Sequence, residues 1–157
     1  MNIYLVSSPG GHLTETLSLL EAFEGCDVSV ITLNFPNMKN VVLKGIRETH
    51  LIPLFFNYSI KLGLPLTMLR SFFTIFRIFL RTRPHLIVST GSEIALPAFF
   101  LGKWLFGSKV IYLECFTRTR SLSLTGRILY RVSDLFLVQW PELTAKLPRA
   151  SYRGRLI

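Results

Sequence analysis

The sequence predicts one α/β domain, a doubly wound parallel sheet with helices on both faces. Short apolar, β-branched runs alternate along the chain with longer segments of helical periodicity. These runs lack the alternation of a sheet that faces water on one side, which indicates strands buried on both faces. At 157 residues the chain is long enough for one such domain and too short for two of full size. The expected single domain therefore spans residues 1–157.

The expected elements follow one another in a regular order. A buried strand over residues 2–7 precedes a helix over 12–24, which Gly25 is placed to stop. Four apolar side chains recur on one face of this helix: Leu13, Leu17, Leu20 and Phe23. The other expected strands cover residues 27–33, 49–54, 85–90, 109–114 and 134–139, and the other helices cover 58–81, 93–106, 122–132 and a short stretch up to Pro148. The strand over residues 134–139 is thus expected to be the last.

The composition is basic and apolar together. The chain has 18 Lys and Arg against 9 Asp and Glu, a formal charge of +9, and half of its residues are hydrophobic. Disordered chains are polar, so this composition argues against disorder. All 18 basic residues follow residue 27, which predicts an anionic partner for the later part of the chain: lipid headgroups, phosphates or nucleic acid. Cys26 and Cys115 match no metal-binding spacing and are typical of reduced, cytosolic thiols.

The sequence predicts no segment that crosses a membrane. A spanning helix needs about 20 mostly apolar residues, and the apolar stretch over 60–80 is interrupted by Lys61, Arg70 and Arg77. Met1 is followed directly by apolar residues, without the basic start of a signal peptide. We therefore expect a peripheral protein at the cytoplasmic face of a membrane.

Three expected strands end in polar motifs. The motifs are SSPGGH over residues 7–12, STGSE over 89–93 and ECFTRTR over 114–120. Ligands of doubly wound sheets bind beyond the carboxyl ends of the strands, so we expect all three motifs at one edge, around one site. Gly10 and Gly11 allow close approach of a ligand to the backbone, and the free N–H groups there favour an anion. A plain strand–helix turn explains the two glycines equally well. A dinucleotide site is disfavoured because the third glycine of its fingerprint is missing.

Several side chains of these motifs suit a phosphate or sugar site. His12 is a candidate general base or phosphate ligand, although it could also cap the local backbone. Glu15, in the first helical turn, could bind a ligand or simply favour the helix dipole. Thr90, Gly91 and Ser92 repeat the glycine turn at a second strand, where an N-cap at Ser92 would alone explain the pattern.

Glu114 ends an otherwise apolar strand and is followed closely by Arg118 and Arg120. A carboxylate at this position either faces water or contacts a ligand hydroxyl. The nearby arginines favour the ligand contact, and they are candidate phosphate ligands themselves. A solvated charged face is the alternative.

The expected helix over 58–81 carries a cationic stripe. Four polar residues recur at helical spacing along it: Arg70, Thr74, Arg77 and Arg81. Phe73 and other apolar side chains occupy the rest of its surface. This pattern predicts an interfacial helix that binds an anionic membrane. The alternative is a core helix with a thin stripe facing solvent. Nucleic-acid binding is disfavoured because the arginines lie in no RNA-binding motif.

Together the motifs resemble a known family. SSPGGHLTE over residues 7–15, STGSEIALPAFFLG over 89–102 and KVIYLECFTRTRSLSLTGRILYRVSDLFLVQWPEL over 109–143 are similar to the acceptor-side, PssD-type subunits of two-subunit GT-B glycosyltransferases. The membrane-anchoring subunit of the eukaryotic UDP-GlcNAc:dolichyl-diphospho-GlcNAc transferase belongs to the same group. The chain departs from the eukaryotic pattern in having no N-terminal anchor helix, which favours a peripheral, prokaryotic protein.

The resemblance implies the Rossmann-like N-terminal half of a GT-B enzyme. Such a subunit binds a polyprenyl-diphosphate acceptor at the membrane, while a separate small subunit of the C-terminal-half type binds the UDP-sugar, with no metal and no further cofactor. Gly10, Gly11, His12 and Glu15 fall on the family's first motif, residues 90–92 on the second, and Glu114 on the acid that ends the fifth strand.

We therefore expect the acceptor diphosphate on the two glycine turns, helped by the arginines. His12 or Glu114 would remove the proton of the acceptor hydroxyl or orient that hydroxyl. Two alternatives remain. The chain could be a non-catalytic subunit that recruits and activates its partner at the membrane, or it could be a basic module that binds nucleotides or nucleic acid.

Overall fold

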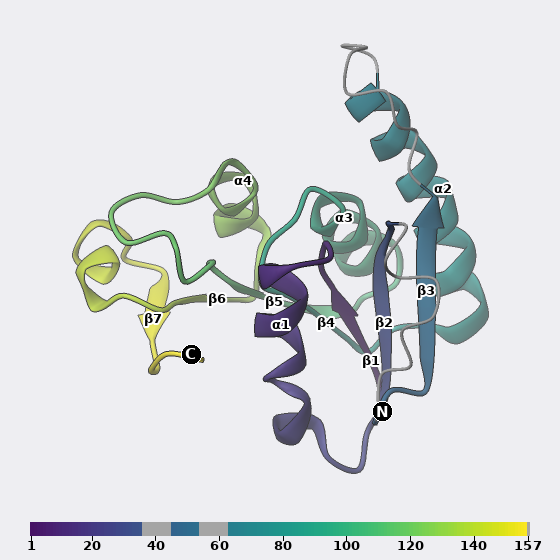
Figure 1. Cartoon of the computed structure of the whole chain (residues 1–157), viewed down its shortest axis with the longest axis horizontal. Helices are drawn as coiled ribbons and strands as arrows, with labels where there is room; N and C mark the ends of the chain where they lie inside the picture. The colour runs from purple at the N-terminus through teal and green to yellow at the C-terminus, as the bar shows by residue number, and fades with distance from the viewer. Residues whose placement is uncertain (36–44, 54–62, 157) are drawn as a thin grey trace.

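A seven-stranded, all-parallel sheet forms the centre of the molecule (Figure 1). The computed structural model describes residues 1–35, 45–53 and 63–156. The strands run in the order β3-β2-β1-β4-β5-β6-β7. Their bounds are β1 Asn2–Val6, β2 Asp27–Asn34, β3 Glu48–Pro53, β4 Leu86–Ser89, β5 Lys109–Leu113, β6 Leu135–Val138 and β7 Ala150–Tyr152. The order reverses direction between β1 and β4, which is the topological switch point of a doubly wound sheet.

Helices cover both faces of the sheet, as predicted. They are α1 Gly11–Leu17, α2 Gly63–Thr82, α3 Ala95–Leu105 and α4 Leu124–Val132, with short 3-10 helices η1 Leu20–Phe23 and η3 Pro141–Lys146. Fully buried side chains of α2, α3 and α4 pack on one face: Ile75, Phe79, Phe99 and Leu129. The four apolar residues predicted for the first helix pack on the other face. Because both faces are covered, neighbouring residues of β1 are buried alike, and no alternation is present in the sequence.

Two expectations about the elements were wrong. The helix expected over 12–24 ends at Leu17, and a separate 3-10 turn follows. Hydroxyl groups of Thr14, Thr16 and Ser18 each bond the carbonyl four residues earlier, a contact that weakens helices. The sheet also does not end at β6, because β7 pairs with β6 in parallel. This edge strand has only three residues and no buried side chain, so it leaves no apolar run in the sequence.

Other predicted boundaries agree with the structure to within a few residues. Leu54, expected at the end of the third strand, and residues 58–62, expected at the start of the long helix, lie outside the described residues. The first turns of α2 extend past the carboxyl end of β3 (Figure 1). In the part of the chain that the structure describes, no helix has both the length and the apolar character needed to span a membrane.

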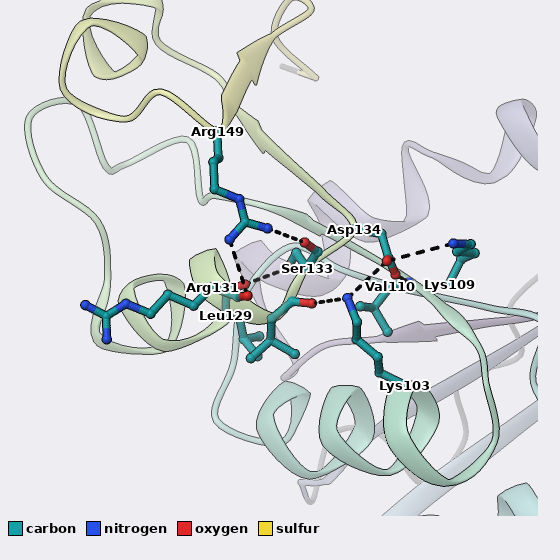
Figure 2. A network of polar contacts seen from close by, with 9 residues as sticks. Lys103, Lys109, Val110, Leu129, Arg131, Ser133, Asp134 and Arg149 are labelled. Carbon is teal, nitrogen blue, oxygen red and sulfur yellow. Dashed lines mark hydrogen bonds and ion pairs between the residues drawn. The ribbon is translucent and has the colours of Figure 1, made fainter.

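A network of hydrogen bonds and ion pairs lies at the edge of the sheet where the strands begin (Figure 2). Lys103 Nζ donates to the carbonyl oxygen of Val132 at 2.6 Å and to Asp134 Oδ1 at 3.0 Å, while Val110 N donates to Asp134 Oδ2 at 2.9 Å. Partial burial alone would raise the pKa of Asp134, but the hydrogen bonds from Val110 and Lys103 outweigh it and hold this pKa below its ordinary value. Arg149 donates to two carbonyl groups near the end of α4. The network ties α3, α4, β5 and the approach to β7 together, away from the candidate site.

Candidate functional site

The carboxyl ends of β1 and β4 flank the switch point, and a glycine turn follows each of them. We call these two turns, residues 7–12 and 89–93, the glycine edge. The motif that follows β5 lies at the same edge, because Phe116 N donates to Glu15 Oε1 of α1 at 3.3 Å. The prediction that the three polar motifs share one edge of the sheet is therefore confirmed.

His12 joins the two turns of the glycine edge. Its Nδ1 lies 3.1 Å from the carbonyl oxygen of Thr90. A carbonyl oxygen can only accept, so Nδ1 donates, and in the neutral ring Nε2 then carries the free lone pair. The hydroxyl of Thr90 donates in turn to the carbonyl oxygen of His12 at 2.8 Å. Among the described residues no hydrogen bond to Nε2 is present, which leaves this nitrogen able to accept a proton.

Gly91 makes room for the ring of His12. A Cβ at residue 91 would lie 2.5 Å from His12 Cε1, and its φ of 134° also favours glycine. Ser92 follows with a φ of 102°, which is uncommon for residues other than glycine. Such strained backbone is often found in functional turns. The alternative explanation of this turn, an N-cap at Ser92, does not hold: α3 begins at Ala95 with Ile94 as its cap, and Ser92 Oγ accepts a long hydrogen bond from Ile94 N.

The other glycine turn is open to solvent. Gly10 and Gly11 are both exposed, and nothing lies within 4 Å of a Cβ added at either residue. Gly10 has a φ of 95°, so its backbone conformation rather than crowding requires glycine. The backbone of this turn is therefore accessible to a ligand.

Glu114 does not face the solvent. Its side chain is 1% exposed, and its carboxylate accepts hydrogen bonds from Cys115 N at 3.0 Å and from the N–H and hydroxyl of Ser123 at 3.0 and 3.2 Å. Burial raises the pKa of Glu114 above its ordinary value, while the hydrogen bonds from Ser123 act in the opposite direction. The carboxylate of Glu114 thus links Cys115 and Ser123, the two ends of the segment that joins β5 to α4, and does not point into the site. We call these contacts the clasp.

Glu15 is enclosed in a similar way. Its side chain is 3% exposed, and its carboxylate accepts from Phe116 N, from the thiol of Cys115 at 3.4 Å and from Gln139 Nε2 at 3.2 Å. Burial raises the pKa of the Cys115 thiol, which keeps it a donor. Glu15 therefore ties α1 to the segment after β5. Gln139 was not predicted from the sequence as part of this edge, although it directly follows the apolar strand β6, as Glu114 directly follows β5.

Arg118 and Arg120 are the exposed part of this segment. We call residues 115–121 the arginine loop. Its first residues are fixed by the contacts to Glu15, whereas both arginine side chains are exposed. The structure thus brings together, at one edge, the glycine edge, His12 and the arginine loop, with Glu15 and Glu114 as buried supports.

The predicted cationic stripe lies on the outer side of α2. Arg77 and Arg81 are exposed, and so are large apolar side chains of the same helix: Leu66, Leu69, Phe72, Phe73 and Leu80. Arg70 and Phe73 both line a hollow of about 460 Å³. A second hollow of the same size, between α2 and α3, is almost entirely apolar, with Phe72 and Phe100 in its lining. The outer surface of α2 therefore exposes both arginine and large apolar side chains. A core helix with a thin polar stripe would expose the polar side chains and bury the apolar ones.

No metal site is formed by the residues that the structure describes, since no group of three or more His, Cys, Asp or Glu side chains is placed to hold an ion.

Comparison with known proteins places these features in context. A family model described as "Oligosaccharide biosynthesis protein Alg14 like" matches residues 59–156. Two curated relatives are named "UDP-N-acetylglucosamine transferase subunit ALG14". The one from Homo sapiens is 29% identical over the whole chain and 83% of its own length. The one from Yarrowia lipolytica is 31% identical over 99% of the chain and 67% of its own length.

Among solved structures, the crystal structure of MurG from Acinetobacter baumannii superposes on 89% of the chain with a TM-score of 0.70 and 23% identity. The chain spans 42% of the MurG chain. This likeness confirms the predicted Rossmann-like, doubly wound fold.

Proposed function

The chain belongs to the Alg14-like family of oligosaccharide biosynthesis proteins, and from this premise we propose that it is the acceptor-side subunit of a two-subunit glycosyltransferase. It binds a sugar linked to a polyprenyl diphosphate at the membrane and recruits a small donor-binding subunit. That subunit holds a UDP-sugar, from which a hexose or GlcNAc is transferred. The relatives named as subunits of a UDP-N-acetylglucosamine transferase support this assignment. The single observation that carries it is the meeting of His12, two glycine turns and the arginine loop at one edge of the sheet.

The acceptor diphosphate rests on the glycine edge. The exposed backbone of Gly10 and Gly11 is open to the diphosphate, and Arg118 and Arg120 of the arginine loop are exposed and supply positive charge. The second turn is buried, and the N–H of Gly91 already donates to Ser89 Oγ, so this turn supports the edge by holding His12. Charge-assisted hydrogen bonds from arginine to phosphate are the strong ones. A diphosphate is the group that this combination suits.

Transfer then needs one proton acceptor. The acceptor hydroxyl attacks the anomeric carbon of the UDP-sugar, its proton passes to His12 Nε2, and UDP leaves with the electrons of the broken C–O bond. Glu114 is not the base in this proposal, because its carboxylate is enclosed and already accepts three hydrogen bonds. Glu15 and Glu114 instead support the arginine loop. Much of the rate acceleration comes from holding acceptor and donor close together in the cleft between the subunits. The proposal includes no metal and no cofactor besides the UDP-sugar.

Reconstitution tests this function. We expect the chain mixed with its donor-binding partner to transfer labelled GlcNAc from UDP-GlcNAc to a GlcNAc-diphosphate-polyprenol, and neither protein alone to do so. Other UDP-hexoses and a polyprenyl monophosphate sugar serve as controls for donor and acceptor. Transfer by the chain alone would overturn the subunit assignment. Failure of the pair with every UDP-sugar would overturn the function.

The outer surface of α2 docks on an anionic bilayer. Arg77 and Arg81 lie at the headgroups, and the exposed apolar side chains, Phe73 among them, enter the acyl boundary. The apolar hollow between α2 and α3 continues this surface. Because α3 follows directly after the turn at Gly91, such docking places the glycine edge beside the bilayer.

Removing two cations from α2 should weaken this docking. We expect R77A/R81A to bind vesicles with 30% phosphatidylserine about 30-fold more weakly, because each arginine near an anionic surface contributes about 1 kcal/mol. Co-sedimentation with vesicles measures this. The control R127A/R131A removes the same charge from α4 and should keep most of the binding. Equal losses in both double variants would show that net charge alone, and not α2, binds the lipid.

A further inference from the structure

Gln139 is the side chain on which three separate segments converge. It lies just after β6, at the same edge of the sheet as the site, and is 1% exposed. Its Nε2 donates to Glu15 Oε2 and to the carbonyl oxygen of Glu114, both at 3.2 Å. Its Oε1 accepts from Leu156 N at 3.0 Å. One amide therefore joins α1, the end of β5 and residues 153–156, which we call the C-terminal segment.

The neighbouring residue adds a second tie between the same segments. Trp140 Nε1 donates to the carbonyl oxygen of Phe116 at 2.6 Å, and the two rings lie 5.2 Å apart. The guanidinium of Arg155 lies 4.0 Å from the centre of the Trp140 ring, within the range of a cation–π contact. The C-terminal segment thus contacts both residues that hold the first part of the arginine loop.

The chemistry of the contacts requires an amide at residue 139. Its donor half faces two oxygens, and its acceptor half faces an N–H group. A glutamate here would put two buried carboxylates about as close as the present 3.2 Å contact, where like charges repel strongly. An apolar residue would leave Glu15 Oε2 and a carbonyl oxygen without donors.

We propose that Gln139 is a positioning residue that fixes the arginine loop at the glycine edge and makes the position of the loop depend on the C-terminal segment. The inference rests on the proposed function only in naming a diphosphate as the ligand of the loop. Because the coupling is reciprocal, displacement of the C-terminal segment loosens the loop, and an anion bound at the loop orders the segment.

Limited proteolysis of the full chain tests this directly, because trypsin cleaves after Arg118 and Arg120. We expect Q139E to speed cleavage at these two bonds at least about fivefold by opening the loop. The exchange variant E15Q/Q139E restores an amide opposite a carboxylate and should return the rate to within about twofold of wild type. L156P removes the N–H that donates to Gln139 Oε1 and should speed the same cleavages about twofold to threefold. R153A, which keeps that N–H, is the matched control and should cleave as wild type.

Two further measurements separate positioning from general destabilisation. In a W104F background Trp140 is the only tryptophan, so its emission reports the contact with Phe116. Q139E should shift this emission while the exchange variant restores it. In the two-subunit enzyme, Q139E should raise KM for the acceptor more than it lowers kcat.

The outcomes are distinct. Wild-type cleavage and emission in both Q139E and L156P would overturn the proposal, as would an exchange variant no better than Q139E. If Q139E does not fold, the comparison of L156P with R153A decides. Weak binding of inorganic pyrophosphate by the wild-type chain would count against the diphosphate site, and the cleavage rates would still decide the role of Gln139.

Discussion

Replacing His12 with alanine is expected to lower kcat of the two-subunit transferase at least about a hundredfold, with KM for the acceptor changed by less than about threefold. The attacking hydroxyl must lose its proton during transfer. In our proposal the lone pair on His12 Nε2, at the glycine edge, accepts this proton. The hydrogen bond from Nδ1 to the carbonyl oxygen of Thr90 fixes which nitrogen carries that lone pair. Initial rates at saturating UDP-GlcNAc and varied acceptor measure the effect.

Two variants control for this result. His85 lies at the amino edge of the sheet, where its Nδ1 accepts from Asn2 N, so H85A should keep wild-type transfer. G91A keeps the imidazole but places a Cβ 2.5 Å from its ring, and should lose nearly as much kcat as H12A. Turnover of H12A within about fivefold of wild type would instead leave the chemistry on the partner and make this chain a recruiting subunit. A raised KM with normal kcat would make His12 a phosphate ligand.

The position of the candidate site was predictable from the sequence because topology determines it. Once buried strands alternate with helices, the sheet is parallel and every strand–helix turn lies at the same edge. The residues of SSPGGH and STGSE had to meet if their strands were neighbours, and the pairing of β1 with β4 makes them so. The arginine stripe of α2 was likewise visible, since helical spacing alone puts Arg77 and Arg81 on one side of the helix.

The roles of the two glutamates were not predictable, because their partners are distant in sequence. Glu114 reads as a charged residue at a strand end, and only the fold shows that Ser123 returns to its carboxylate. Glu15 meets Gln139, which lies 124 residues further along the chain. Such contacts follow from strand order and loop paths, which local patterns do not encode. The edge strand β7 was not predicted for a different reason: it has only three residues and none of them is buried, so it leaves no apolar pattern in the sequence.

Among the glycines that the structure describes, Gly126 is the one whose replacement by alanine should cost the most stability. A Cβ at this position, in the first turns of α4, would lie 2.0 Å from Glu114 Oε2 and 2.9 Å from Ser123 Oγ. Both atoms belong to the buried clasp of the arginine loop, and Ser123 Oγ also caps α4 by accepting from Gly126 N at 2.9 Å. We expect G126A to lower the free energy of unfolding by about 2–4 kcal/mol, because the carboxylate must move and lose its donors. The melting temperature should fall by roughly 5–12 °C in calorimetry.

A double-mutant cycle identifies the cause of this loss. E114A is itself destabilising, since the N–H groups of Cys115 and Ser123 lose their acceptor. In that background the carboxylate is gone and only Ser123 Oγ, 2.9 Å from the added Cβ, has to shift, so G126A should cost less than about 1 kcal/mol. G102A is the matched comparison: its Cβ would lie 2.1 Å from Ile87 Cδ1, the flexible end of an apolar side chain, and should cost only about 1 kcal/mol. If G126A costs the same with and without the carboxylate of Glu114, the clasp does not require glycine at residue 126, and the close packing of α4 against the end of β5 must have another origin.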